Sequence, residues 1–365
     1  MLDAWALIEL AFQIGASDLH LTAGFPPAFR LHGEVLPANV LAERGILKVG
    51  EFAPLRPEDT DRLAREIMDE ELYSRLMEKG EYDFSFPLPG KGRCRVNAFK
   101  QRGTIALAIR PIPGRVPSLE QLGLPESVKN LARRPHGLVL VTGPTGSGKS
   151  TTLAAMIDLL NNERHCHIIT LEDPLEYIHQ NRKSIINQRE IGRDTFSFAS
   201  ALRAALREDP DVILVGEMRD LETIATAITA AETGHLVLAT LHTGSAAQTI
   251  DRIIDIFPPY QQQQIRLQLA GSLQGVIVQQ LLPRRDRQGR VLALEIMIAT
   301  PAIGNLIREG KTYQIISQIQ TGARYGMQTM DTALRNLYRE GLVSREDVLG
   351  RAADPETLLR FLDNF

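Results

Sequence analysis

A glycine-rich stretch from Gly143 to Thr151 has the residue types needed to bind a phosphate group. It reads GPTGSGKST and matches G-x-x-x-x-G-K-[ST], a pattern in which glycines let backbone N–H groups surround a phosphate. We expect Lys149 to reach the outer phosphates of ATP and the Ser150 hydroxyl to coordinate Mg²⁺. The residues predicted to bind the nucleotide are Gly143, Thr145, Gly146, Ser147, Gly148, Lys149, Ser150 and Thr151.

A carboxylate follows the apolar run Val212–Val215, after one intervening glycine, Gly216. In P-loop ATPases a carboxylate at such a strand end faces the γ-phosphate and can orient the attacking water. We therefore predict that Glu217 is catalytic, the alternative being a charge at a helix N-terminus. Gly216 stands where a Mg²⁺-binding Asp often sits. Metal binding is thus expected to depend on Ser150, water and other carboxylates.

An acidic pair, Glu172 and Asp173, lies within the stretch Ile169–Glu176, at the C-terminal end of a predicted strand. The carboxyl ends of parallel strands share one edge of a sheet, where such sheets bind ligands. These two acids could hold Mg²⁺ through water, and Glu172 could help to position the nucleophile. Alternatively, Asp173 and Pro174 only begin a turn.

Histidines and arginines supply further candidates for contacts to the γ-phosphate. His242 ends the apolar run that His235 precedes, and its position favours a phosphate-sensing role over a structural one. Arg95 and Arg110 lie on predicted strands just before a proline-rich segment, so a separate domain could bring them to the phosphates. Exposed charges that protect a sheet edge would explain these two arginines almost as well. Weaker candidates, which surface ion pairs would also explain, are Arg203, Arg207 and Arg219.

The elements that must position these residues belong to an α/β domain. The loop lies between an apolar strand at 138–142 and a helix at 151–161. Further alternation predicts a parallel sheet with crossover helices. The remaining predicted elements are 167–171, 198–207, 211–215, 221–232 and 236–241, then mostly helices from residue 249 with a strand pair near 276–282 and 291–298.

The first third of the chain predicts a smaller α+β domain. Period-2 alternation marks strands and amphipathic stretches mark helices. The predicted elements are a helix at 4–14, strands at 17–22 and 28–33, an irregular loop at 37–57, a helical pair at 59–79, and strands at 82–86, 93–99 and 104–110. The segment Pro111–Pro117 holds three prolines and a glycine, which should continue neither element. We expect domains at 1–112 and 118–365, joined by a linker at 113–117.

Composition limits the class of protein. The 365 residues are 44% hydrophobic and 23% charged, with a formal net charge of -3. This balance disfavours a general nucleic-acid binder. The two cysteines, Cys94 and Cys166, are not in a C-x-x-C pair, which fits a reducing cytoplasm. We find neither a signal peptide nor an apolar run near the ~20 residues that span a bilayer, so a soluble protein is expected.

Together these motifs resemble the secretion-type hexameric ATPases, and within that superfamily the type IV pilus retraction ATPases. The match covers nearly the whole chain. The motifs that carry it are Gly15–Leu21 and Arg93–Phe99 near the N-terminus, Gly143–Thr151 as Walker A, Ile169–Tyr177 as the Asp box, Val212–Asp220 as Walker B and Thr233–Thr243 as the His box. The absence of a cysteine-rich metal module and the stretch Gly322–Asp331 favour the retraction type over assembly or type II secretion ATPases.

The resemblance implies a RecA-like P-loop ATPase domain behind a PAS-like N-terminal domain, in a homo-hexameric ring. It implies Glu217 as the catalytic carboxylate, Glu172 as its assistant, and Arg95 and Arg110 as residues that approach the phosphates when the ring closes. It further implies ATP hydrolysis with Mg²⁺ that drives pilus retraction and twitching motility. The expected partners are an inner-membrane pilus platform protein and the pilus machinery, without nucleic acid or direct membrane insertion. The expected location is cytoplasmic, peripheral at the inner face of the cytoplasmic membrane.

One departure from the family pattern concerns the motif AIRNLIRE, which reads Ala302-Ile-Gly-Asn-Leu-Ile-Arg-Glu309 here. Gly304 replaces an arginine inside a predicted helix, at a cost of ~1 kcal/mol in helix propensity. Hydrolysis should survive this change, and coupling to retraction is the property it bears on. The alternatives to a retraction motor are an accessory retraction ATPase, an assembly motor, a RecA-like nucleic-acid motor and a nucleotide-binding regulator without turnover.

Overall fold

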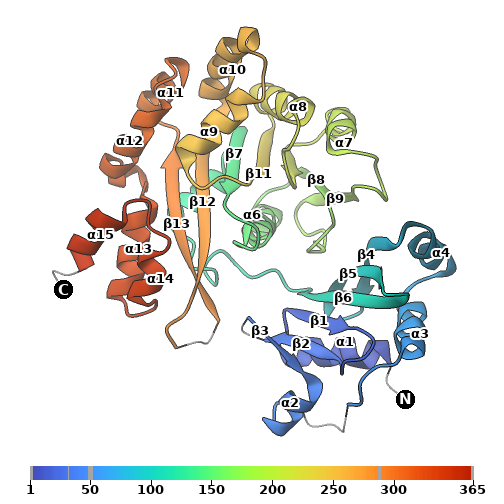
Figure 1. Cartoon of the computed structure of the whole chain (residues 1–365). Coiled ribbons are helices and arrows are strands. Elements are labelled where there is room, and N and C mark those ends of the chain that lie inside the picture. The colour runs from blue at the N-terminus through green and yellow to red at the C-terminus, as the bar shows by residue number, and fades with distance from the viewer. Residues whose placement is uncertain (1–2, 32, 48–51, 287–288, 363–365) are drawn as a thin grey trace. The chain divides into compact units, whose positions relative to one another are not determined.

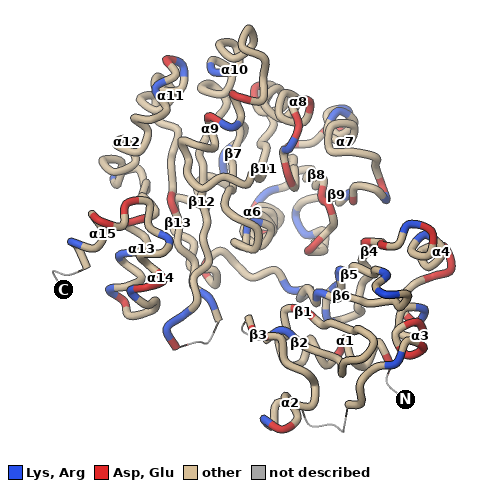
Figure 2. Tube along the Cα trace, viewed as in Figure 1, with Lys and Arg blue, Asp and Glu red and all other residues tan. Residues whose placement is uncertain are grey.

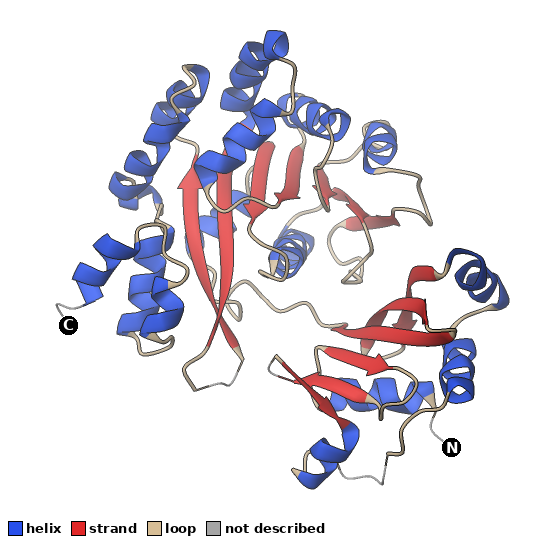
Figure 3. Cartoon of the chain, in the orientation of Figure 1, coloured by secondary structure: helices blue, strands red, loops and turns tan. Residues whose placement is uncertain are grey.

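The computed structural model describes residues 3–31, 33–47, 52–286 and 289–362. The chain divides into two compact units (Figures 1 and 3). The N-terminal unit is Met1–Arg115 with Glu176–Ile178, and the C-terminal unit is Val116–Leu175 with His179–Phe365. Basic and acidic segments are interspersed over both units (Figure 2). Within the described ranges, no helix combines the length and apolar character needed to cross a membrane.

The N-terminal unit is an antiparallel sheet with helices. Its strand order is β3-β2-β1-β6-β5-β4. The strands are β1 (Asp18–Leu21), β2 (Ala28–Leu31), β3 (Glu34–Pro37), β4 (Glu81–Leu88), β5 (Gly92–Gln101) and β6 (Thr104–Pro113), and the helices are α1 (Ala4–Gln13), α2 (Ala38–Glu43), α3 (Pro57–Ile67) and α4 (Glu70–Lys79). Leu19, Phe29 and Ile109 pack with α1 and α3 in one apolar core. The alternation of β1 consequently directs Asp18 and His20 to the other face.

Three details of this unit differ from the sequence-based prediction. The irregular loop expected at 37–57 contains α2, and β3 was not predicted. The prolines at 111 and 113 continue β6 instead of ending it. Gly114 donates to Lys91 O on the β5 side, so strand alternation turns the nitrogens of Pro111 and Pro113 away from β5. The pairing with β1 ends before these residues, so neither proline needs a backbone donor there.

The C-terminal unit contains a seven-stranded sheet in the order β13-β12-β7-β11-β10-β8-β9, parallel except for β13. The strands are β7 (Gly137–Thr142), β8 (His167–Glu172), β9 (Ile185–Glu190), β10 (Val212–Val215), β11 (Leu236–Leu241), β12 (Leu273–Pro283) and β13 (Arg290–Ile298). The helices are α5 (Glu126–Ala132), α6 (Lys149–Glu163), α7 (Phe198–Ala205), α8 (Leu221–Glu232), α9 (Ala246–Asp255), α10 (Pro259–Ser272), α11 (Pro301–Arg308), α12 (Ile315–Thr321), α13 (Met330–Arg339), α14 (Arg345–Leu349) and α15 (Pro355–Leu362). Among the strands of the C-terminal unit, only β9 was not predicted.

Helices cover both faces of this sheet. Leu138 and Leu140 of β7 pack in one cluster with α8, α9 and α10. Val139 and Val141, which alternate with them, pack on the other side with α6. Strands β7, β10 and β11 are buried along their whole length, as expected for central parallel strands. The parallel pairing of β8, β10, β11 and β7 brings their carboxyl ends to one edge, where the predicted site residues follow.

Candidate active site

The loop between β7 and α6 has a backbone path that only glycine permits at its start. Gly143 has φ +138, and a Cβ there would lie 2.3 Å from Gln279 O on β12. Gly148 has φ +88 and precedes the first residue of α6. The loop can therefore pass close to β12, while the N-terminus of α6 faces the concave side of the loop. Backbone N–H groups in this arrangement can bind a phosphate.

The predicted nucleotide-binding residues lie at different depths in this loop. Thr145 and Gly146 are exposed at its tip, Ser147 and Lys149 are buried, and the other members are buried or half-buried. The ammonium of Lys149 donates to Gly143 O at 2.9 Å and to Pro144 O at 3.1 Å. These bonds fold the lysine back across the loop, where a phosphate could replace the carbonyl oxygens as its partner.

Glu217 is at the centre of a polar chain that reaches the loop. The Nζ atom of Lys149 is 3.5 Å from His242 Nδ1, and His242 Nε2 is 3.3 Å from Glu217 Oε1. Because lysine can only donate, His242 can bridge the two groups in the tautomer that accepts at Nδ1 and donates from Nε2 to the carboxylate. The structure thus brings Lys149, Glu217 and His242 together, although they come from three different parts of the chain.

Arg219 also contacts Glu217, with 2.6 Å between Nε and Oε1. Burial alone would raise the pKa of Glu217, but the Arg219 hydrogen bond and the electrostatic interactions with His242, Arg219 and Lys149 hold this pKa below its usual value. Sequence reasoning ranked Arg219 low because a surface ion pair explained it. Its spacing of two from Glu217 was the available signal, since both residues follow the end of the same strand.

Gly216 fills a place with no room for a side chain. Its N–H donates to Leu171 O at 2.7 Å, and a Cβ would lie 3.0 Å from that oxygen and 3.3 Å from the Glu172 Cα. An Asp at this position would require the ends of β8 and β10 to separate. Thr240 donates from its hydroxyl to Gly216 O at 2.6 Å. This close approach explains the glycine that the sequence places before Glu217.

The two acids of the predicted pair, Glu172 and Asp173, have different surroundings. Glu172 is half-buried and accepts a hydrogen bond from the Thr170 hydroxyl at 2.7 Å. Asp173 is exposed, precedes a cis peptide bond to Pro174, and contributes to the raised pKa of Arg219. Within the residues that the structure describes, no group of three His, Cys, Asp or Glu side chains is placed to hold a metal. The donors present fit Mg²⁺ only as an ion shared with phosphate oxygens and water.

Arg95 and Arg110 belong to the N-terminal unit, where they face each other across β5 and β6. Arg110 is exposed and forms an ion pair with Asp18, with 2.8 Å between Nη2 and Oδ1. Asp18 also lies 3.7 Å from Arg30, its partner in register on β2. The two predicted arginines thus lie in one row across the sheet, on the face opposite the apolar core. Sequence reasoning did not identify Arg30 as the third arginine of this row.

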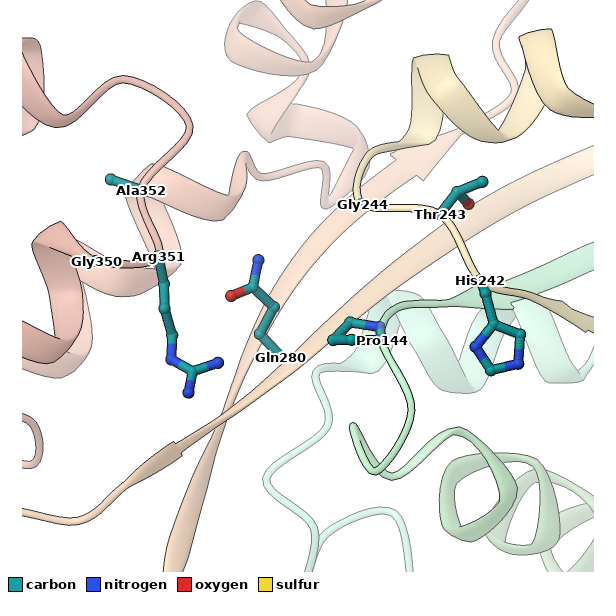
Figure 4. A pocket seen from close by; sticks show the side chains of 8 residues that line it. All are labelled: Pro144, His242, Thr243, Gly244, Gln280, Gly350, Arg351 and Ala352. Carbon is teal, nitrogen blue, oxygen red and sulfur yellow. The ribbon is translucent and has the colours of Figure 1, made fainter.

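A cavity of about 430 Å³ opens beside the loop (Figure 4). Pro144, His242 and Gln280 line one side, and Arg351 extends toward them from the C-terminal helices. Its remaining lining residues are Thr243, Gly244, Gly350 and Ala352. The cavity separates the segment after β11 from the chain between α14 and α15.

A phosphate-binding loop after β7, a carboxylate after β10 and a histidine after β11 on one edge of a parallel sheet define a P-loop ATPase. The family model described as Type II/IV secretion system protein matches residues 94–350, and the chain belongs to this family. The predicted family and the predicted RecA-like fold class are confirmed.

The similarity to individual relatives extends over nearly the full length. The type IV pilus retraction ATPase PilT of Pseudomonas aeruginosa is 51% identical over 97% of this chain and 99% of its own. A twitching motility protein of Neisseria gonorrhoeae is 49% identical over 91% of this chain and 86% of its own. The crystal structure of the pilus retraction motor PilT with bound ADP superposes with a TM-score of 0.87 at 52% identity, covering 99% of this chain and 100% of that one.

Proposed function

We propose that this chain is a hexameric motor that couples ATP hydrolysis to retraction of a type IV pilus. The observation that carries the proposal is the chain of contacts from Lys149 through His242 to Glu217 at the phosphate-binding loop. Its occurrence in a protein 51% identical to a pilus retraction ATPase over 97% of the chain supports this specific function.

The residues of the C-terminal unit would divide the reaction between them. The loop 143–151 binds the phosphates of ATP through backbone N–H groups, with Lys149 at the outer phosphates. Glu217 orients the attacking water, Glu172 helps to place it, and His242 senses the γ-phosphate. Mg²⁺ would be held by Ser150, with Glu172 and Asp173 acting through water, and would neutralise charge on the phosphate oxygens.

The N-terminal unit would supply the positive charge that this site lacks. We infer that Arg95 and Arg110 approach the phosphates when the two domains, 1–112 and 118–365, close on the nucleotide. Arg110 would then exchange Asp18 for phosphate as its partner. The segment 113–117 would act as the linker where the motion occurs, and ring closure would convert hydrolysis into movement.

The proposed partners follow from the same assignment. Six copies would form a ring in the cytoplasm, at the inner face of the cytoplasmic membrane, where the ring meets an inner-membrane pilus platform protein. A second candidate is an accessory retraction ATPase. The observation that favours it is the glycine at position 304, where the family pattern has an arginine.

Deletion of the gene, scored for surface pili and twitching, tests the proposal. Pili that accumulate without motility would support retraction, whereas cells without pili would indicate assembly. If the protein is a motor, a gene copy reintroduced into the deletion strain should restore twitching only when its product hydrolyses ATP. A Glu217→Gln chain should therefore fail to restore it while still binding ATP. A Glu222→Gln chain, changed at an exposed glutamate of α8, should restore it.

In vitro, Glu217→Gln should abolish ATP hydrolysis and leave nucleotide binding intact. Unchanged hydrolysis would remove Glu217 from its role. Strong stimulation of the wild-type ATPase by DNA would instead favour a nucleic-acid motor and contradict the pilus assignment.

A further inference from the structure

Two helices of the C-terminal unit begin at the same buried carboxylate. Glu295 lies on β13, is 4% exposed, and accepts a hydrogen bond from the N–H of Ala246 at 2.8 Å. It also accepts from the N–H of Met330. Ala246 is the first residue of α9 and Met330 is the first residue of α13. One anion therefore satisfies a free N–H group at two helix N-termini, where negative charge is also favourable to both helix dipoles.

The α9 end of this link leads directly to the nucleotide site. His242, which contacts Glu217 and Lys149, is separated from Ala246 by only three residues. The last of them, Ser245, is the N-cap of α9. A shift of the α9 N-terminus is therefore transmitted to the His242 ring through the short segment 242–245. We call this segment the sensor loop.

The other end of the link leads to the C-terminal helices. The start of α13 is held to β13 by reciprocal backbone hydrogen bonds between Ile296 and Gln328, of 2.9 and 3.1 Å. Asp331, the second residue of α13, accepts from the N–H groups of Ala353 at 2.8 Å and Asp354 at 3.1 Å. These two residues lead into α15. Two carboxylates in sequence thus connect the sensor loop to the end of the described chain.

Hollow space lies beside this connection. The sensor loop and the segment 350–353 face each other across two cavities of about 430 Å³ each, and Arg351 lines both. Figure 4 shows the first of them. Glu295 itself lines the second cavity. Since the space between the two segments is hollow, the hydrogen bonds of Glu295 and Asp331 help to set their relative position, together with the packing of α9 and α13 in the apolar core.

We propose that Glu295 is a positioning residue for ATP hydrolysis, which ties the sensor loop to the C-terminal helices and so sets His242 against Glu217. This proposal rests on the proposed ATPase function of the Glu217 site. Movement of the sensor loop between nucleotide states is passed through Glu295 to α13 and through Asp331 to α15. A carboxylate suits both bonds because it only accepts hydrogen bonds, whereas a glutamine of the same shape replaces one acceptor oxygen by an amide donor.

The test compares full-length Glu295→Gln with wild type by steady-state ATPase kinetics and nucleotide binding. We expect kcat to fall about tenfold, the equivalent of one lost buried hydrogen bond, with nucleotide affinity within about twofold. The matched control is Asp354→Asn, because Asp354 caps α15 through Thr357 and its side chain has no part in the link. This control should retain wild-type kcat. An unchanged kcat in Glu295→Gln, or an equal loss in the control, would overturn the proposal.

Hydrogen exchange supplies a second readout, which simple destabilisation would not reproduce. In wild type, amides of 350–356 should exchange differently with ADP than with a non-hydrolysable ATP analogue. Glu295→Gln should lose this difference, and so should Asp331→Asn, which breaks the next bond. A difference that persists in both variants would refute the link. Glu217→Gln keeps the link and should keep the difference, so hydrolysis by Glu217→Gln would count against the proposed function alone.

Discussion

Replacement of Gly216 by Ala tests whether the close approach of β8 and β10 positions Glu217, the proposed catalytic carboxylate. The added Cβ would meet Leu171 O at 3.0 Å and the Glu172 Cα at 3.3 Å. Both neighbours are backbone atoms at the end of a buried strand, so they cannot turn away as a flexible side chain would. The strand ends must separate by a few tenths of an ångström.

The magnitude follows from two terms. Overpacking of this kind costs about 1–3 kcal/mol, and weakening the 2.7 Å hydrogen bond from Gly216 to Leu171 O adds ~1 kcal/mol. The displaced backbone carries Glu217 directly. Since a misplacement of 1 Å can reduce a rate about a hundredfold, a shift of a few tenths should lower kcat several-fold to roughly tenfold.

The assay follows unfolding in urea by circular dichroism alongside ATP turnover. The matched control is Gly271→Ala, because Gly271 lies in the last turn of α10 with no atom within 4 Å of the added Cβ. That control should be as stable as wild type or slightly more stable, with normal kcat. Trp5, the single tryptophan, lies in the N-terminal unit, so its fluorescence transition should not move in either variant. Equal midpoints and rates for Gly216→Ala and wild type would refute the reasoning.

Three further results are expected. Gly304→Ala should stabilise α11 by about 0.5–1 kcal/mol in thermal unfolding, because the added Cβ meets its nearest atom at an ordinary 3.5 Å; a loss of stability would contradict this. Arg219→Ala should move the acid limb of the pH–kcat profile upward. Arg219 holds the pKa of Glu217 down, and the ionised form is lost as pH falls through that pKa, so removing Arg219 makes the loss begin at higher pH; an unmoved limb would refute the assignment. Arg95→Ala and Arg110→Ala should reduce turnover by about 10³-fold, as loss of an arginine finger does, with little change in nucleotide affinity; normal hydrolysis in both would place the phosphate contacts elsewhere.

The position of the candidate active site at one edge of the sheet was predictable because it follows from local patterns and one topological rule. A parallel strand that ends in a polar residue places this residue at the ligand-binding edge, whatever its partners. Glu172, Glu217 and His242 were predicted in this way. The structure places Glu172 as the last residue of β8, Glu217 after β10 and His242 after β11. The rule needs only the strand ends, which the apolar runs mark clearly.

The residues that were missed depend on contacts between distant parts of the chain. Glu295 resembles any acid on a strand in sequence, and its partner Ala246 is 49 residues away and contributes only a backbone N–H. The edge strand β9 alternates weakly, with exposed Ile185 at its start. The wrong prediction that β6 ends before Pro111 has a similar origin. A proline is tolerated at this position because the pairing of β6 with β1 stops before it. None of these conditions produces a recognisable pattern in the neighbouring sequence.

The electrostatics of Glu217 bear on how the site would hydrolyse ATP. A carboxylate with a lowered pKa is a weak base, and here Arg219 and His242 both stabilise its ionised form. Phosphoryl transfer through a loose transition state requires little proton removal from the attacking water before bond cleavage. An ionised Glu217 is therefore suited to orient the water, and the further requirement of the reaction is positive charge around the phosphates. The arginine row of the N-terminal unit could meet this requirement. Its member Arg110 is paired with Asp18 and could exchange this carboxylate for a phosphate.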